Sequence, residues 1–283
     1  MSWILFALSS VVSFTFLNLL QRVLAVDSKH PRAMAVLFNG TAALIALLIF
    51  AFSGAYKSFS LPTEPQAWIA LLIASFCYGM FERGRFVAAK LLDASALTTI
   101  INISVVIAII GSSWLYSEPL TSNKLFGGAL ILIALLMVSF GNQTKKSPLK
   151  GVFVGILISI MLGLGWMLDK LGTQYFNSGT YNILIWILPT VFIFFPYIKL
   201  EVINSELKVA SWKVFLLAGL NVIGYLMQLK ALEIAEATRV IPILQTSTLF
   251  TVLLGVVFLR EREHILRKVL AGIIAVTGAY FLI

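Results

Sequence analysis

Long apolar runs alternate with short polar separators along the whole chain. The runs cover approximately 2–24, 33–53, 66–90, 94–116, 124–141, 150–170, 180–199, 211–232, 237–259 and 266–283. A helix needs about 20 residues to cross a bilayer core of about 30 Å, and most of these runs are close to that length. Because lipid offers no hydrogen-bond partner to an open sheet edge, we expect the runs to be helices. The pattern predicts an all-α polytopic membrane protein of ten transmembrane helices.

The composition agrees with a lipid environment. Of the 283 residues, 60% are hydrophobic and 12% are charged, whereas a soluble domain carries about 25% charged residues. This composition excludes a soluble enzyme, a disulfide-rich secreted domain and a nucleic-acid-binding protein. The single Cys77 cannot form an internal disulfide. The first run has no basic segment before it and exceeds the about 7–15 apolar residues of a signal peptide, so we expect it to be retained.

The basic residues are unevenly divided between the two sides of the predicted bundle. The odd-numbered loops and their flanks hold sixteen of the 21 Lys and Arg, and the even-numbered loops hold five. The positive-inside rule places the odd-numbered loops in the cytoplasm and both termini on the non-cytoplasmic side. We expect an integral protein of a bacterial plasma membrane, as a monomer or homodimer. Its expected partners are the lipid bilayer and a small-molecule substrate, with no nucleic acid.

The second half of the chain repeats the first at an offset of 143 residues. The offset pairs Ala94 with Ala237, Ser95 with Thr238, Ser104 with Ser247 and Glu118 with Glu261. Each unit contains five predicted spans, an odd number, so the second copy crosses the membrane in the opposite sense. Two such inverted repeats, 1–143 and 144–283, with a site between them near the midplane, predict an alternating-access transporter.

The two units resemble the paired EamA domains of the drug/metabolite transporter superfamily. The residues that carry the resemblance in the first half are Ala94-Ser95, Ser117-Glu118-Pro119-Leu120-Thr121 and Gly127-Gly128; in the second they are Ala237-Thr238, Pro242, Leu259-Arg260-Glu261-Arg262-Glu263 and Gly272. Pro242 stands where the family commonly has a proline, whereas the first half has Thr99 at that position. The resemblance implies a transporter of amino acids, metabolites, nucleotide sugars or drugs.

Ionisable residues inside a span are costly, about 2.5–3.5 kcal/mol each, and persist mainly where they face water or one another. Glu82, Arg83 and Arg85 form such a group in the third span, and Glu82 and Arg85 share a helix face. One interpretation is a binding site in which an arginine pairs with an anionic group and Glu82 with an amino group. The alternative is an anchor at the end of the helix, with the side chains extended to the interface.

The repeat adds further candidates for substrate binding. The offset pairs Glu82 with Tyr225 and Arg85 with Gln228, with Lys230 close by, and it pairs Asn102 with Gln245. Trp166, in a glycine-containing span, offers a broad face for an apolar or cationic cargo. The predicted substrate-binding residues are therefore Glu82, Arg83, Arg85, Asn102, Trp166, Tyr225, Gln228, Lys230 and Gln245. A gating or structural role is predicted for Pro242, Glu118 and Glu261.

These observations predict a secondary transporter that moves a small polar or zwitterionic metabolite by alternating access. An amino acid is one candidate cargo, export is the predicted direction, and Glu82 and Asp169 are candidates for proton coupling. No enzyme motif, metal site, nucleotide loop or other cofactor site is recognised. The alternatives are an exporter of apolar or cationic drug-like compounds, a polytopic enzyme acting on lipid, and a channel-like scaffold.

Overall fold

The computed structural model describes residues 2–24, 28–92, 94–139, 148–258 and 264–283. The regular elements in these ranges are helices, with no strand among them. The first half contains α1 (Trp3–Leu24), α2 (Pro31–Phe52), the 3-10 helix η1 (Ala55–Ser58), α3 (Pro65–Leu91), α4 (Ala94–Ile101), α5 (Ile103–Tyr116) and α6 (Ser122–Ser139). The second half contains α7 (Leu149–Tyr175), α8 (Ser178–Phe194), α9 (Leu200–Ala210), α10 (Lys213–Ile234), α11 (Ala237–Phe258) and α12 (Ile265–Leu282). The expected all-α membrane fold is confirmed.

Eight segments in the described residues are long and apolar enough to cross a membrane. They are Trp3–Gln21 of α1, Thr99–Tyr116, and helices α2, α6, α7, α10, α11 and α12. Helix α8 is apolar but shorter, at 17 residues. Helix α3 has 27 residues, and its C-terminal part carries the ionisable group at 82–85. The number of ten crossings stays a prediction.

The polar separators begin helices for identifiable reasons. Pro31 and Pro65 stand in the first turns of α2 and α3, where the missing N–H of proline costs no hydrogen bond. The Asn177 Oδ1 accepts hydrogen bonds from the backbone N–H of Gly179 at 2.8 Å and of Thr180 at 3.3 Å, and so caps α8. Local chemistry in the sequence therefore fixes several of the helix starts.

Two elements differ from the predicted runs. The run 94–116 is not one helix, because α4 ends at Ile101 and α5 begins at Ile103. At the break, the Asn102 side-chain amide donates a hydrogen bond to Ser139 Oγ at 3.2 Å. The segment between α8 and α10 contains the unpredicted helix α9. The Glu206 carboxylate of α9 accepts hydrogen bonds from the backbone N–H groups of Lys29 and His30, just before α2.

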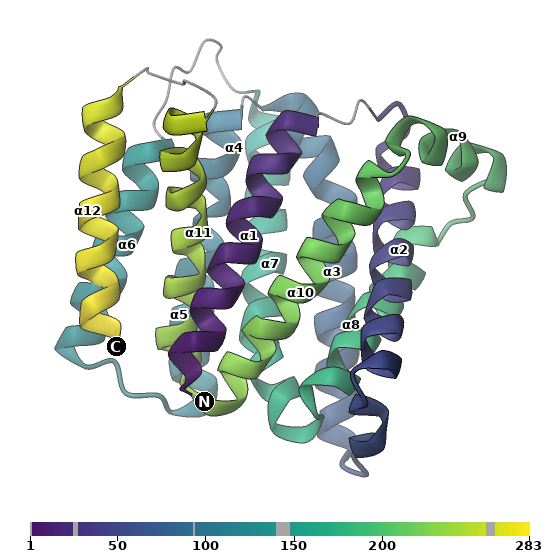
Figure 1. Cartoon of the computed structure of the whole chain (residues 1–283), viewed down its shortest axis with the longest axis horizontal. Helices are drawn as coiled ribbons and strands as arrows, with labels where there is room; N and C mark the ends of the chain where they lie inside the picture. The colour runs from purple at the N-terminus through teal and green to yellow at the C-terminus, as the bar shows by residue number, and fades with distance from the viewer. Residues whose placement is uncertain (1, 25–27, 93, 140–147, 259–263) are drawn as a thin grey trace.

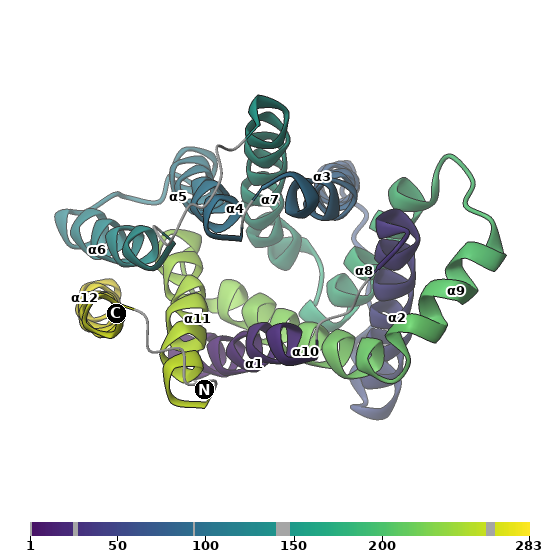
Figure 2. The same ribbon diagram turned by 90° about the horizontal axis from the view of Figure 1, so that it is seen from above.

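The helices of the two halves pack against one another in matched pairs. The most extensive contacts include α3 with α7, α1 with α10, and α6 with α12. In the repeat, α1, α2, α3 and α5 correspond to α7, α8, α10 and α11. Exchanging corresponding helices converts the α3–α7 pair into α10–α1, the α3–α8 pair into α10–α2, and the α5–α7 pair into α11–α1. All of these pairs are in contact, and Figure 2 shows helices of both halves around one centre. The two repeats are therefore related by an approximate twofold exchange.

The chain ends and the connections divide between two faces of the bundle. Figure 1 shows the N- and C-terminal ends on one face, and α9 with the C-terminal end of α1 on the opposite face. We call these the terminal face and the α9 face. Two clusters of buried apolar side chains flank the centre, one mainly on α2, α3, α8 and α10, and the other mainly on α1, α6, α11 and α12.

Candidate substrate cavity

A cavity lies between the two halves, near the middle of the bundle. Its volume is about 270 Å³, close to the lower end of the roughly 300–1,000 Å³ that is usual for ligand sites. Six carboxamide side chains line it, from four helices: Asn18, Gln21, Asn39, Asn221, Gln228 and Gln245. Its aromatic lining residues are Phe14, Tyr78, Phe81, Trp166, Trp186 and Tyr225. A site of this size and composition suits a small polar molecule with an apolar part.

An ion pair lies in the cavity wall, toward the α9 face. Arg85 Nε and Glu82 Oε2 are 2.8 Å apart, three residues apart on α3. The Arg85 guanidinium also lies over the Phe38 ring, 5.4 Å from its centroid. Both charged side chains line the cavity, so this wall presents a cation and an anion side by side.

A second carboxylate lies behind the floor of the cavity, by which we mean the end of the cavity toward the terminal face. Asp169 of α7 is 0% exposed, and its carboxylate accepts four hydrogen bonds from neutral donors. The donors are Tyr78 Oη at 2.6 Å, Tyr225 Oη at 2.7 Å, Tyr181 Oη at 3.3 Å and Gln228 Nε2 at 3.3 Å. We call these five residues the aspartate–tyrosine cluster. Tyr78, Tyr225 and Gln228 also line the cavity, so Asp169 lies directly behind its lining.

Two glycines of α7 make room for this cluster. A Cβ added at Gly172 would lie 2.2 Å from the Tyr181 ring, and one added at Gly165 would lie 2.9 Å from the Tyr78 ring. Gly165, Asp169 and Gly172 follow the i, i+4, i+7 spacing of one helix face. Glycine on either side of the aspartate therefore lets two tyrosine rings pack against α7 with their hydroxyl groups on Asp169.

Beyond the floor, polar contacts join the two halves at the terminal face. The Glu118 carboxylate, after α5, accepts hydrogen bonds from the backbone N–H of Ala237 at 2.9 Å and of Thr238 at 2.8 Å, at the start of α11. Lys124 Nζ lies 2.7 Å from Glu236 Oε2. These contacts close the bundle below the cavity. The matched Glu261 lies outside the described residues.

The structure brings six of the nine predicted binding residues into the cavity lining: Glu82, Arg85, Trp166, Tyr225, Gln228 and Gln245. Both of the residue pairs that the offset relates, Glu82 with Tyr225 and Arg85 with Gln228, lie in this lining. The two inverted repeats therefore place matched polar positions around one cavity.

The other three predicted binding residues lie outside the lining. Arg83 donates hydrogen bonds to the carbonyl oxygens of Phe192 and Phe195, near the end of α8. Asn102 contacts Ser139 at the α4–α5 break. Lys230 lies over the Phe6 ring, 5.6 Å from its centroid. Pro242 is buried inside α11.

The sequence analysis did not predict Tyr78, Tyr181 or Trp186, which lie in or next to the aspartate–tyrosine cluster. Tyr78 lies one turn before Glu82 on α3, and that spacing is a usable signal. Tyr181 and Trp186 of α8 carried no comparable signal, because the offset of 143 pairs them with positions in the second predicted span, Phe38 and Ala43, where no polar group stood out. Within the described residues, no three His, Cys, Asp or Glu side chains come together as a metal site.

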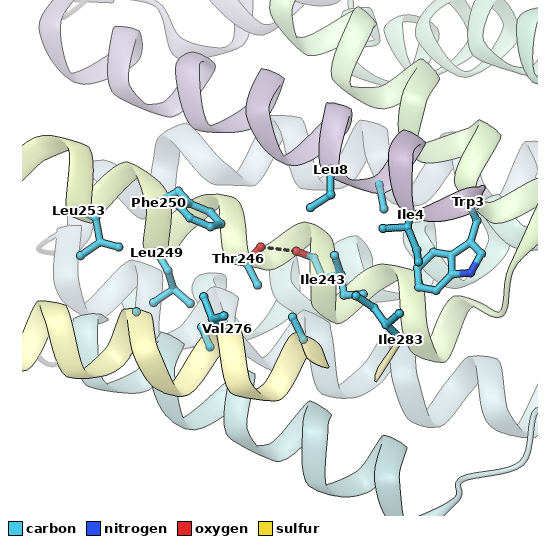
Figure 3. Close-up of a pocket in the computed structure, with 14 residues that line it drawn as sticks. Trp3, Ile4, Leu8, Ile243, Thr246, Leu249, Phe250, Leu253, Val276 and Ile283 are labelled. Carbon is cyan, nitrogen blue, oxygen red and sulfur yellow. Dashed lines mark hydrogen bonds between the residues drawn. The ribbon is translucent and has the colours of Figure 1, made fainter. Parts of the chain in front are cut away.

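A separate cavity of about 210 Å³ lies among α1, α11 and α12 (Figure 3). Its lining is almost wholly apolar and includes Trp3, Leu8, Phe250 and Val276. The hydroxyl of Thr246 donates its hydrogen bond to the Ile243 carbonyl of its own helix. The chemistry of this cavity therefore differs from that of the central cavity, which is lined by carboxamide and charged side chains.

Comparison with known proteins gives one family and one fold. The sequence profile of the EamA-like transporter family matches residues 1–140 and again 149–283. A solved structure described as "Crystal structure of protein" is similar over 98% of this chain and 94% of its own, with a TM-score of 0.75 and 12% sequence identity. At that identity the likeness shows the fold alone. No curated protein matches the chain.

Proposed function

Because the chain belongs to the EamA-like transporter family, and is thus a membrane transporter, we propose that it moves a small zwitterionic metabolite through the central cavity by alternating access. Amino acids are the leading candidates, and export is the proposed direction. The observation that carries the proposal is the Glu82–Arg85 ion pair in the wall of a small cavity rich in carboxamide groups.

The ion pair matches the charge pattern of a zwitterion. A carboxylate can form two parallel hydrogen bonds with a guanidinium, and an ammonium group can bind a carboxylate. Arg85 and Glu82 therefore offer one partner to each end of an α-amino acid, and the net charge of the pair and of the cargo is zero. The carboxamides around them can both donate and accept hydrogen bonds to the remaining polar atoms.

The shape of the bundle suits an access cycle. Gln21, near the α9 face, is exposed, whereas Asp169 and Tyr181 at the floor are fully buried. From this difference in burial we infer that the cavity opens toward the α9 face and is closed toward the terminal face. The α9 face carries the basic loops predicted to be cytoplasmic, so this conformation would accept cargo from the cytoplasm. If the two inverted repeats exchanged their conformations, the cavity would open toward the terminal face and close toward the α9 face.

A thermal-shift screen with the twenty L-amino acids, followed by counterflow of a labelled hit in liposomes, tests the proposal. We expect a hit to stabilise the wild-type protein, and Arg85→Ala and Gln245→Ala to reduce that stabilisation. Arg83→Ala is the matched control, because it removes an arginine of the same helix that lies outside the cavity. Equal stabilisation of all variants by the hit would contradict the assigned site. A response only to apolar or cationic compounds would favour a drug exporter, for which Trp166 and Trp186 provide the aromatic surface.

A further inference from the structure

The aspartate–tyrosine cluster holds a buried acid without a cationic partner. Among the described residues, no Lys or Arg forms an ion pair with Asp169. Its helix neighbour Lys170 donates instead to the carbonyl oxygens of Leu232 and Ala235, at 2.5 and 2.9 Å. Arg85 is paired with Glu82. The cost of ionising a fully buried carboxylate is therefore offset by neutral dipoles alone.

The polar groups that face Asp169 come from three of the helices packed around α7. They are Tyr78 of α3, Tyr181 of α8 and Tyr225 of α10, together with the amide of Gln228. Tyr116 of α5 does not bond to Asp169 but donates to the Met167 carbonyl oxygen at 2.6 Å. All of these groups are neutral at physiological pH, so none of them fixes the charge of the aspartate.

Such a shell accommodates both protonation states. A phenol hydroxyl can donate or accept a hydrogen bond. When Asp169 is ionised, its two oxygens accept from the four donors, as in this structure. When it is protonated, its O–H can donate to a tyrosine oxygen, and that hydroxyl can rotate. A guanidinium partner has no acceptor and would favour the ionised form alone.

The cluster also connects the carboxyl group to the cavity. Tyr78, Tyr225 and Gln228 contact Asp169 on one side and line the cavity on the other. Cargo that displaces either hydroxyl group, or a rotation of α10 against α7 during the access change, alters the hydrogen bonds of the carboxyl group. Proton binding and cavity state are therefore linked through the same side chains.

We propose that Asp169 is the proton-binding residue that couples transport to a proton gradient, an inference that rests on the proposed transport function. In one access state a carboxylate oxygen of Asp169 takes up a proton from water in the cavity. In the other state it releases that proton to the opposite side. One proton then crosses the membrane for each cycle, in the direction opposite to exported cargo.

Infrared difference spectroscopy of the full-length protein in nanodiscs tests proton binding without cargo. Between about pH 9 and about pH 5, we expect the wild type to gain the carbonyl stretch of a buried protonated carboxyl group. Asp169→Asn should lack that band, and the matched control Glu82→Gln should retain it. Tyr78→Phe keeps the acid but removes its shortest hydrogen bond, so its band should appear at a higher pH. A band that is unchanged in both the Asp169 and the Tyr78 variants would overturn the proposal.

Transport in liposomes with a radiolabelled L-amino acid mixture tests the coupling. A gradient of one pH unit, coupled one to one, supports accumulation of up to about tenfold. We expect Asp169→Asn to lose this accumulation, and the counterflow measured for this variant should not depend on the gradient. Wild-type counterflow that ignores the gradient, or a variant that still responds to it, would overturn the coupling. Absence of wild-type counterflow, with the Asp169 band present, would instead contradict the proposed cargo and support the proton site.

Discussion

Glu82 and Asp169 are two buried carboxylates in and behind the wall of the same cavity, and they differ in their surroundings. Glu82, 7% exposed, lies 2.8 Å from a guanidinium. Asp169, 0% exposed, has three phenols and an amide as its partners. A cation close to a carboxylate stabilises the ionised form, whereas neutral donors permit both forms. The two buried acids thus differ in the charge of their partners, and the different roles that we propose for them rest on that difference.

The largest expected effect comes from breaking the ion pair. Arg85→Gln leaves Glu82 buried without its cation, and we expect a loss of about 2–4 kcal/mol in the free energy of unfolding. The double variant Glu82→Gln/Arg85→Gln should recover most of that loss, since it buries no unpaired charge. Unfolding in mixed micelles measures both. Equal losses in the single and double variants would show that leaving Glu82 without its cation carries no extra cost.

In the aspartate–tyrosine cluster, we expect the loss of stability on removing a tyrosine hydroxyl to be larger for the shorter hydrogen bond. A hydrogen bond to a charged group contributes about 1.5–3 kcal/mol. Above about pH 9, where the ionised form is favoured, Tyr78→Phe removes the 2.6 Å bond and should cost more than Tyr181→Phe, which removes the 3.3 Å bond. Tyr280→Phe is the control, because Tyr280 is 78% exposed. The same micelle unfolding assay ranks the three, and a larger loss for Tyr181→Phe would contradict the geometry.

The glycine that accommodates Tyr181 provides a steric test of the floor. Gly172→Ala would place a methyl group 2.2 Å from the ring, and overpacking of this kind costs about 1–3 kcal/mol. In Gly219→Ala of α10 the nearest atom is 4.0 Å away, so that variant should be neutral or slightly stabilising. The melting temperature of the purified protein distinguishes them. Equal melting temperatures of the two variants would mean that the Tyr181 ring can move away from the added methyl group without loss of stability.

The repeat pattern predicted which helical segments reach the cavity better than it predicted the direction of a side chain. The offset pairs Glu82 with Tyr225 and Arg85 with Gln228, and the structure places all four in one lining. The same offset pairs Asn102 with Gln245, but only Gln245 reaches the cavity. The helix ends and restarts at Asn102, so its side chain is redirected to Ser139. A sequence offset carries no information on such a local break.

The aspartate–tyrosine cluster shows a second kind of contact that the sequence did not predict. The aspartate itself was a candidate, because an acid inside an apolar span is unusual. Its tyrosine partners come from three other helices: Tyr78 of α3 and Tyr225 of α10 lie 91 and 56 residues away along the chain, and Tyr181 of α8 lies 12 residues away. Tyr181 reaches Asp169 only because Gly172 leaves space for its ring. Contacts of this kind depend on how three helices pack, and the apolar pattern of each helix does not specify that packing.

At the closed end of the bundle, Glu118 acts as a cap contributed by the other half of the chain. Its carboxylate accepts from two backbone N–H groups at the start of α11, and loss of such a cap costs about 0.5–2 kcal/mol. We expect Glu118→Gln to lower the free energy of unfolding by about 1 kcal/mol, because each N–H bonds to a different carboxylate oxygen and the amide keeps only one acceptor oxygen. Glu201→Gln, at an exposed position of α9, is the control. Equal stability of the two variants would show that the cap is replaceable by water.

The smallest expected effect concerns Glu236, in the connection between α10 and α11 on the same closed face. Burial opposes ionisation of Glu236, but the hydrogen bond and charge of Lys124, with the charge of Arg239, outweigh it and hold the pKa of this carboxyl below its ordinary value of 4.5. The pair with Lys124 should contribute about 0–1 kcal/mol, discounted for solvent because the Glu236 side chain is 35% exposed.

The sign of the pH dependence follows from that lowered pKa. A folded-state pKa below the unfolded value stabilises the protein at pH values above the unfolded pKa, and this contribution is lost as the pH falls through the folded pKa. The stability difference between wild type and Glu236→Gln should therefore be constant near neutral pH and should disappear below about pH 4. Glu64→Gln, at an exposed position before α3, controls for the loss of one carboxylate. If the stability difference between wild type and Glu236→Gln grew on acidification, the ionised Glu236 would destabilise the closed face. That result would contradict the stabilising pairs with Lys124 and Arg239.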